Sequence, residues 1–94
     1  MKLLESKVAI VTGGSRGIGK AICQSFAENG CDVAFTYNNS KESAENLANE
    51  LNNMGVKAIA YKSDASSFDD SSKLVDDVIS DFGKIDVLVN NAGI

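Results

Sequence analysis

The chain has 94 residues and a mass of 9.9 kDa, enough for one domain with one hydrophobic core. Its 44% of hydrophobic residues is close to the globular average, and its net charge of −4 argues against a general nucleic-acid-binding protein. The absence of histidine excludes histidine-dependent catalysis, and no apolar run approaches the roughly 18 residues of a membrane span, so we expect a cytosolic protein without a membrane partner.

Short apolar runs alternate with amphipathic stretches along the whole chain. The runs are continuously apolar and rich in β-branched residues, which predicts strands buried on both faces, at residues 8–11, 33–37, 56–61 and 85–89. Apolar residues at helical spacing predict three helices between these strands. Their predicted core faces comprise Ile18, Ala21, Ile22, Ser25 and Phe26 in the first, Ala44, Leu47, Ala48 and Leu51 in the second, and Val75, Val78, Ile79 and Phe82 in the third.

Capping residues agree with these helices. Asn39 with Glu42, and Ser67 with Asp70, have the spacing of an N-cap and its reciprocal acid. Glycines follow each predicted helix where a left-handed C-cap is expected, at Gly30, Gly55 and Gly83. Alternating strands and helices without a hairpin signal predict a parallel α/β sheet.

Right-handed crossovers limit how such a sheet is wound. With the strand order 3-2-1-4, the first two helices cover one face and the third covers the other. The first and fourth strands are then neighbours at the point where the winding reverses. Ligands of doubly wound, Rossmann-type sheets bind there, outside the carboxyl ends of the strands.

A glycine-rich turn follows the first predicted strand, with the sequence TGGSRGIG at residues 12–19. Gly13, Gly17 and Gly19 permit positive φ angles and close approach of a ligand to the backbone. The N–H groups and the dipole at the start of the following helix favour a phosphate, and no acid occurs between Glu5 and Glu28. The pattern predicts a phosphate-binding turn, although some glycine-rich turns are only tight connections.

A P-loop is a second interpretation of the same segment. Residues 14–20 satisfy the first part of its motif, which ends in a glycine and a lysine, here Gly19 and Lys20. A P-loop then requires Ser or Thr to hold Mg²⁺, but the next residue is Ala21. The missing magnesium ligand disfavours this interpretation.

A second turn, Asn90-Asn91-Ala92-Gly93, follows the fourth predicted strand. In the order 3-2-1-4 it lies beside the first turn, where small residues leave room for a flat ligand and the asparagine amides supply donors and acceptors. By itself this segment also fits an ordinary Asn/Gly turn.

Together these motifs resemble the short-chain dehydrogenase/reductase family along all 94 positions. The resemblance is carried by Thr12, Gly13, Gly17 and Gly19, by Asp64 after the third strand, and by the Asn90–Gly93 turn. Within the family, residues 14–19 and 89–94 are most similar to bacterial 3-oxoacyl-[acyl-carrier-protein] reductases, and related sugar and alcohol dehydrogenases are close. Without the resemblance, Asp64 would be interpreted as a turn or capping acid.

The resemblance implies a cofactor site built from these segments. The pyrophosphate and the adenosine ribose would be held by Gly13, Gly14, Ser15, Arg16, Gly17, Ile18 and Gly19. Asp64 and Ala65 would contact the adenine, and the backbone of Asn90, Asn91, Ala92 and Gly93 would line the ribose side. For the whole enzyme the resemblance also implies an acyl carrier protein as partner and a homo-oligomer.

The cofactor can be predicted from the end of the second strand. An NAD site carries Asp or Glu there for the ribose 2′-hydroxyl, whereas residues 37–41 of this chain contain no acid and the next one is Glu42. Asn38 would not repel a 2′-phosphate, and Arg16 can form a bidentate contact with one, although it also fits a solvated loop charge. We therefore expect NADP(H) rather than NAD(H).

Catalytic residues are not expected in this chain. The resemblance implies a Ser and a Tyr-x-x-x-Lys after a fifth strand, beyond Ile94. Tyr37 and Lys41 match that spacing, but they lie at the adenosine end of the predicted site and cannot face a nicotinamide. Cys23 is expected to pack on a helix and Cys31 at a strand edge, without a partner for nucleophilic work.

We therefore expect residues 1–94 to be the dinucleotide-binding portion of a single-domain NADPH-dependent reductase that acts on a 3-oxoacyl thioester. A non-catalytic dinucleotide-binding or interaction module is the alternative. The fourth strand would be an open apolar edge and one face would have a single helix as cover, so we expect a longer natural polypeptide, and self-association or dye binding by the isolated chain.

Overall fold

The computed structural model describes residues 3–14, 17–64 and 67–91. Its elements alternate along the chain as predicted: β1 (Val8–Thr12), α1 (Gly17–Glu28), β2 (Asp32–Tyr37), α2 (Lys41–Asn53), β3 (Ala58–Lys62), α3 (Phe68–Phe82) and β4 (Val87–Asn90). All three strand pairings are parallel, and the strand order is β3-β2-β1-β4. The predicted doubly wound sheet, with β1 beside β4, is confirmed.

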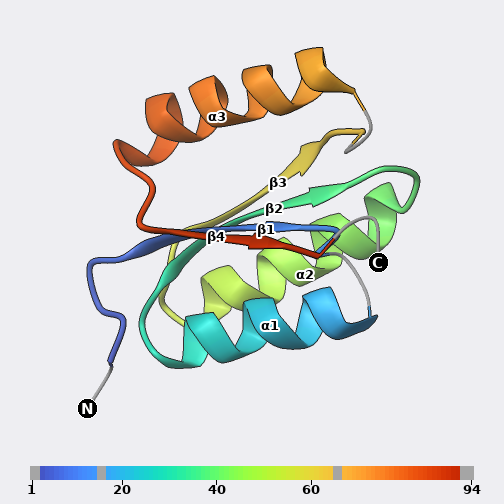
Figure 1. Ribbon diagram of the computed structural model, residues 1–94. Helices are drawn as coiled ribbons and strands as arrows, with labels where there is room; N and C mark the ends of the chain where they lie inside the picture. The colour runs from blue at the N-terminus through green and yellow to red at the C-terminus, as the bar shows by residue number, and fades with distance from the viewer. Residues whose placement is uncertain (1–2, 15–16, 65–66, 92–94) are drawn as a thin grey trace.

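Three layers are visible in Figure 1, with α1 and α2 on one face of the sheet and α3 on the other. Each face has its own core. One core joins Val11, Val33 and Phe35 to the buried residues of α1 and α2. The other joins Val8, Ile10 and Ala34 to Leu74 and Val78 of α3. The predicted division of the helices between the faces is therefore confirmed.

Two of the predicted helix faces are right only in part: Ile22 and Phe26 of α1, and Val78 and Phe82 of α3, pack against the cores as predicted, whereas the other buried positions differ. In α1 the residues against the sheet are Gly19, Cys23 and Ala27, and Ile18 is 71% exposed. The glycine at position 19 allows the start of α1 to lie close to the preceding turn, since a Cβ there would be 2.2 Å from the Gly13 carbonyl oxygen. In α3, Leu74 and Val78 are buried, while Val75 and Ile79 are 46% and 45% exposed. The predicted face of α2 is confirmed by Ala44, Leu47 and Leu51.

The helix ends differ from the prediction in their details. Ser40, not Asn39, is the N-cap of α2, and its side chain makes no capping hydrogen bond. Ser67 caps α3 as predicted by accepting from the Asp70 N–H at 3.2 Å. The Asp70 carboxylate, however, accepts from the Asp64 N–H at 2.9 Å instead of bonding back to the cap residue. Positive φ angles follow all three helices as expected, at Gly30, Gly55 and Gly83, although the C-cap of α2 is Met54.

Two strands begin later than predicted, and beside the start of each an aspartate carboxylate accepts a backbone N–H. The Lys57 N–H donates to Asp32 Oδ1 at 2.9 Å, and β3 starts at the next residue. Asp86 Oδ2 accepts from the Val8 N–H at 2.8 Å, and β4 has four residues. Within the described ranges, none of the helices combines the length and the hydropathy needed to cross a membrane.

Candidate functional site

The glycine-rich turn between β1 and α1 depends on two different properties of glycine. Gly13 and Gly17 have φ angles of 68° and 64°, as predicted, a region in which side chains are strained. Gly19 lies inside α1 and is needed for another reason. A Cβ at this position would lie 2.2 Å from the carbonyl oxygen of Gly13 and 2.8 Å from Asn91 Nδ2. The first turn of α1 therefore touches the backbone of the turn directly.

Gly14 has no room for a side chain either. A Cβ there would lie 2.8 Å from Cβ of Phe35 and 2.9 Å from Sγ of Cys23. Both of those residues are fully buried, so the turn rests directly on the core. The N–H groups at the start of α1 have no partner inside the helix, which leaves them available to an anion beside this turn.

Thr36, near the end of β2, is hydrogen-bonded to the glycine-rich turn through both its side chain and its backbone. Its hydroxyl accepts from the Gly13 N–H at 2.9 Å, and its carbonyl accepts from the Gly14 N–H at 3.1 Å. Its side chain is 3% exposed. Sequence reasoning missed this residue, although a threonine inside an otherwise apolar run was a signal that its hydroxyl has a partner.

The described part of the second turn, Asn90 and Asn91, lies against the first turn, as predicted. The Asn91 N–H donates to Thr12 Oγ1 at 2.9 Å, and Asn91 Nδ2 donates to the Gly13 carbonyl oxygen at 3.3 Å. The Thr12 hydroxyl also lies 3.2 Å from Asn90 Oδ1. Residues far apart in the sequence therefore form one polar junction where the winding of the sheet reverses.

A cavity of about 190 Å³ opens beside this junction at the carboxyl ends of the strands. Each strand end contributes one polar side chain: Thr12, Thr36, Ser63 and Asn90. The floor is apolar and includes Ile10, Leu74 and Leu88. Ser63 was also missed, because it lies just beyond the predicted third strand. The cavity has the mixed lining of a small-molecule site, with a few polar groups over an apolar floor.

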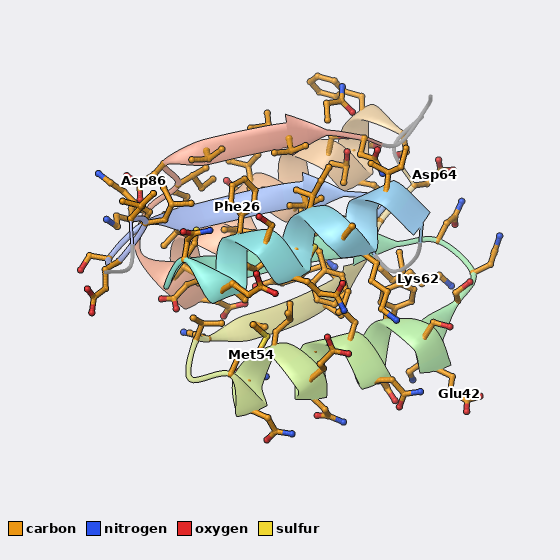
Figure 2. All side chains as sticks on the ribbon, turned by 90° about the horizontal axis from the view of Figure 1, so that it is seen from below. Phe26, Glu42, Met54, Lys62, Asp64 and Asp86 are labelled. Carbon is orange, nitrogen blue, oxygen red and sulfur yellow. The ribbon has the colours of Figure 1, made fainter. Side chains whose placement is uncertain are left out.

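The other predicted site residues lie around the same edge. Asn38 is exposed after β2, and Asp64 is exposed after β3, with its N–H bonded to Asp70. Figure 2 places Asp64 at the same end of the molecule as Glu42 and opposite Asp86. Ile18, at the start of α1, is exposed. The remaining predicted residues lie outside the described part of the chain: Ser15, Arg16, Ala65, Ala92 and Gly93.

Neither cysteine has the properties of a nucleophile. Cys23 is completely buried under the glycine-rich turn, and burial raises the pKa of its thiol to about 12. Cys31 is buried before β2, and burial, followed by the charge of Asp32, raises its thiol pKa to about 11. Both thiols are therefore protonated at neutral pH, which agrees with the predicted packing roles.

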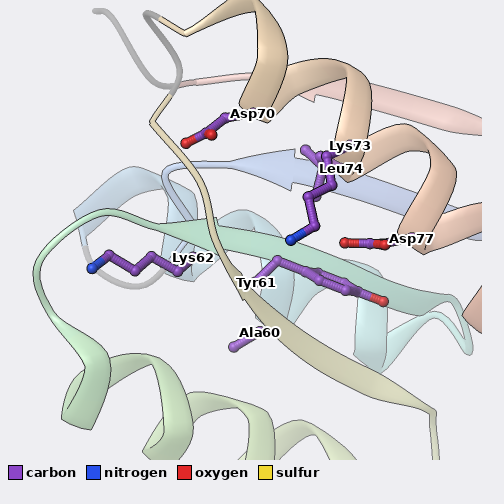
Figure 3. Close-up of a pocket in the computed structure, with 7 residues that line it drawn as sticks. All are labelled: Ala60, Tyr61, Lys62, Asp70, Lys73, Leu74 and Asp77. Atoms are coloured by element: carbon purple, nitrogen blue, oxygen red, sulfur yellow. The ribbon is translucent and has the colours of Figure 1, made fainter.

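A separate cavity of about 290 Å³ lies between β3 and α3. Figure 3 shows Tyr61 of β3 beside Lys73 and Asp77 of α3. The Tyr61 hydroxyl donates to Asp81 at 2.6 Å, and burial together with this bond raises the pKa of Tyr61. None of the predicted cofactor residues lines this cavity, and the charged groups on its walls alternate in sign. We therefore place the functional site at the glycine-rich turn.

Comparison with known proteins identifies the family. The family model for short chain dehydrogenases matches residues 7–94. The chain belongs to the short-chain dehydrogenase family. This match confirms the resemblance carried by the two turns. The solved structures described below confirm the Rossmann-type fold.

Several family members are closely similar to this chain. A 3-oxoacyl-[acyl-carrier-protein] reductase from Staphylococcus epidermidis is 44% identical over 95% of the chain and 36% of its own length. An NADP-dependent mannitol dehydrogenase from Alternaria alternata is 48% identical over 96% of the chain and 35% of its own length. A short chain dehydrogenase from Burkholderia cenocepacia, solved in complex with NADP, has 46% identity and a TM-score of 0.94 over 97% of the chain and 37% of its own. The chain thus spans little more than a third of the length of these relatives.

Proposed function

We propose that this chain is the cofactor-binding portion of an NADP-dependent oxidoreductase. One observation carries the proposal: at Gly17, where α1 begins, a Cβ would meet no described atom within 4 Å, and at Gly19 a side chain would collide with the Gly13 carbonyl oxygen. Such a bare turn at a helix N-terminus suits a diphosphate, because the phosphate oxygens can approach unpaired backbone N–H groups.

The chain's own residues would bind and orient the dinucleotide. The first turn of α1 would hold the diphosphate, with the exposed Lys20 nearby on the same helix. The second turn is fixed against the first by Asn91 and would border the ribose. When bound, the nicotinamide cofactor would supply a hydride for reduction of a carbonyl group. The proton for that reduction would come from residues outside this chain.

The end of β2 favours the 2′-phosphorylated cofactor. Asn38 and Asn39 are exposed after Tyr37, and neither can repel a phosphate. A carboxylate at this place would instead accept from the 2′-hydroxyl of NAD(H). The relatives described as NADP-dependent, or solved with NADP or NADPH, support the same choice.

For the whole protein we propose reduction of a 3-oxoacyl thioester on an acyl carrier protein, in fatty acid biosynthesis, by a cytosolic homo-oligomer. Reductases of this name are about 44% identical to the chain, which supports that substrate. A sugar or alcohol dehydrogenase is the second candidate, because the mannitol dehydrogenase reaches 48% identity. A Ser and a Tyr-x-x-x-Lys in a longer polypeptide would favour an enzyme over a non-catalytic binding module.

Calorimetric titration of the 94-residue chain with NADPH and NADH tests the cofactor proposal. We expect tighter binding of NADPH, and we expect Asn38→Asp to weaken NADPH binding by about tenfold, because it places a carboxylate beside the 2′-phosphate. Asn53→Asp, at an exposed position that ends α2, is the matched control and should change neither affinity. Equal dissociation constants for the two cofactors would contradict the proposal. Tight magnesium-dependent ATP binding would instead support a P-loop.

A further inference from the structure

Thr36 contacts the glycine-rich turn through both its side chain and its backbone. The hydroxyl accepts from the Gly13 N–H at 2.9 Å, and the carbonyl accepts from the Gly14 N–H at 3.1 Å. A threonine on a strand normally bonds to neighbours in the sheet or to water. Here, two consecutive N–H groups of a turn 23 residues earlier converge on one residue that is 3% exposed.

The peptide units around Gly13 are held on three sides. Thr36 binds the Gly13 N–H, Asn91 Nδ2 donates to the Gly13 carbonyl oxygen at 3.3 Å, and α1 packs on that oxygen at Gly19. Gly13 itself has a φ of 68°, a conformation that a free glycine leaves readily. Because α1 packs on the Gly13 carbonyl oxygen at Gly19, a change in the orientation of the Gly13 peptide would also displace the start of α1.

The same threonine is tied to the other end of the predicted cofactor. Asn38 follows Thr36 by two residues on the same chain segment, and β2 ends between them at Tyr37. The Tyr37 carbonyl is itself fixed, since it accepts from the Ser63 N–H at 3.0 Å. A displacement at the end of β2 would therefore move two parts of the proposed site together: the glycine-rich turn, which would hold the diphosphate, and Asn38, which would lie beside the 2′-phosphate.

From these contacts we infer that Thr36 is a positioning residue for dinucleotide binding: its hydroxyl fixes the turn in the conformation that presents the α1 N–H groups to the diphosphate. The inference rests on the proposed function, because it assigns a role within that same site. Thr36 would act through the backbone of Gly13 and Gly14, to which its hydroxyl and its carbonyl are hydrogen-bonded.

Thr36→Val tests this inference, because valine has nearly the shape of threonine but no hydroxyl. It leaves the Gly13 N–H without its partner, and we expect NADPH and 2′,5′-ADP to bind about tenfold more weakly. Thr36→Ser retains the hydroxyl and should restore the affinity of the original chain. Val33→Ala, in the fully buried part of β2, is the control for lost stability and should leave both affinities unchanged.

Amide hydrogen exchange provides a second readout that needs no ligand. In Thr36→Val we expect the Gly13 amide to exchange faster by more than the loss of global stability accounts for, whereas in Thr36→Ser and Val33→Ala we expect its exchange to follow global stability alone. If the original chain binds neither nucleotide, the proposed function fails, and the exchange result still reports whether Thr36 holds the turn. If Thr36→Val binds both nucleotides as tightly as the original chain, or if its Gly13 amide keeps its protection, the inference is wrong.

Discussion

Gly19 provides the sharpest test of the geometry, because helix propensity and packing predict opposite effects for Gly19→Ala. Alanine is a better helix former than glycine by about 1 kcal/mol, so a substitution inside a helix usually stabilises it. At this position the new Cβ would lie 2.2 Å from the Gly13 carbonyl oxygen. The two groups must separate by about 1 Å or more to reach an ordinary van der Waals distance.

That separation is difficult to achieve. The Gly13 unit is fixed by Thr36 on one side and by Asn91 on the other, so the oxygen cannot turn aside without breaking a hydrogen bond. We expect Gly19→Ala to lower the free energy of unfolding by about 1–3 kcal/mol through overpacking. We also expect it to weaken NADPH binding by about a hundredfold, because the start of α1 shifts relative to the turn.

Calorimetric titration and urea unfolding measure the two effects separately. Gly83→Ala is the matched control, since it makes the same chemical change at the end of α3, where a Cβ has nothing within 4 Å and φ is 87°. It should lower stability through backbone strain and leave NADPH binding unchanged. A Gly19→Ala chain that is more stable than the original and binds NADPH equally well would refute the packing argument.

Three further predictions concern the rest of the chain. Leu88 is an apolar side chain of β4 that is 66% exposed, and Leu88→Lys should reduce self-association measured by light scattering, or dye binding measured by fluorescence. Leu3→Lys, at a side chain that is 74% exposed, is the control and should reduce neither. Equal effects of the two substitutions would contradict this prediction. Burial raises both thiol pKa values above their ordinary 9.0, so the stability that the two thiols contribute is complete below pH 9 and is lost as pH rises toward 11 to 12. The urea midpoint should therefore fall less over that pH range in Cys23→Ala/Cys31→Ala than in the original chain. An unchanged fall would assign the loss of stability to other groups. The hydrogen bond from the Val8 N–H, followed by Lys84, lowers the pKa of Asp86 below its ordinary 3.8. The stability that Asp86 contributes is therefore present above pH 3.8 and is lost as pH falls further. Asp86→Asn should flatten that part of the profile of stability against pH, and an unaltered profile would count against the bond.

The sequence predicts the topology well because hydrophobic pattern and chirality are properties of the chain itself. The buried runs of β1 and β2 and the glycines after each helix are local signals, and the right-handed crossover rule converts them into the order β3-β2-β1-β4. The predicted helix faces are less accurate, since the apolar periodicity does not reveal that α1 packs on the preceding turn at Gly19 or that Ile18 is exposed.

The candidate site likewise contains residues that the sequence predicts and residues that it does not. Gly13, Gly17 and Asn91 could be found from their motifs, because those motifs encode backbone conformation and turn chemistry. For Thr36 the sequence indicates only that a hydroxyl in an apolar run has a partner. The places of Thr36 and Ser63 in the site come from strands that are adjacent only in the folded sheet. The start of α2 has a backbone hydrogen bond from the Ala44 N–H to the Ser40 carbonyl oxygen, and β4 starts beside the bond from the Val8 N–H to Asp86; composition and spacing specify neither bond.

The Gly13 peptide unit also determines when this site can exist. Its partners lie 23 and 78 residues further along the chain, at Thr36 and Asn91. A ribosome-bound chain that has not yet exposed Asn91 therefore lacks the finished pocket, even with the glycine-rich segment fully synthesised. A captured nucleotide would in turn hold the last strand against the first, so resistance to proteases should increase on ligand addition most strongly at β4.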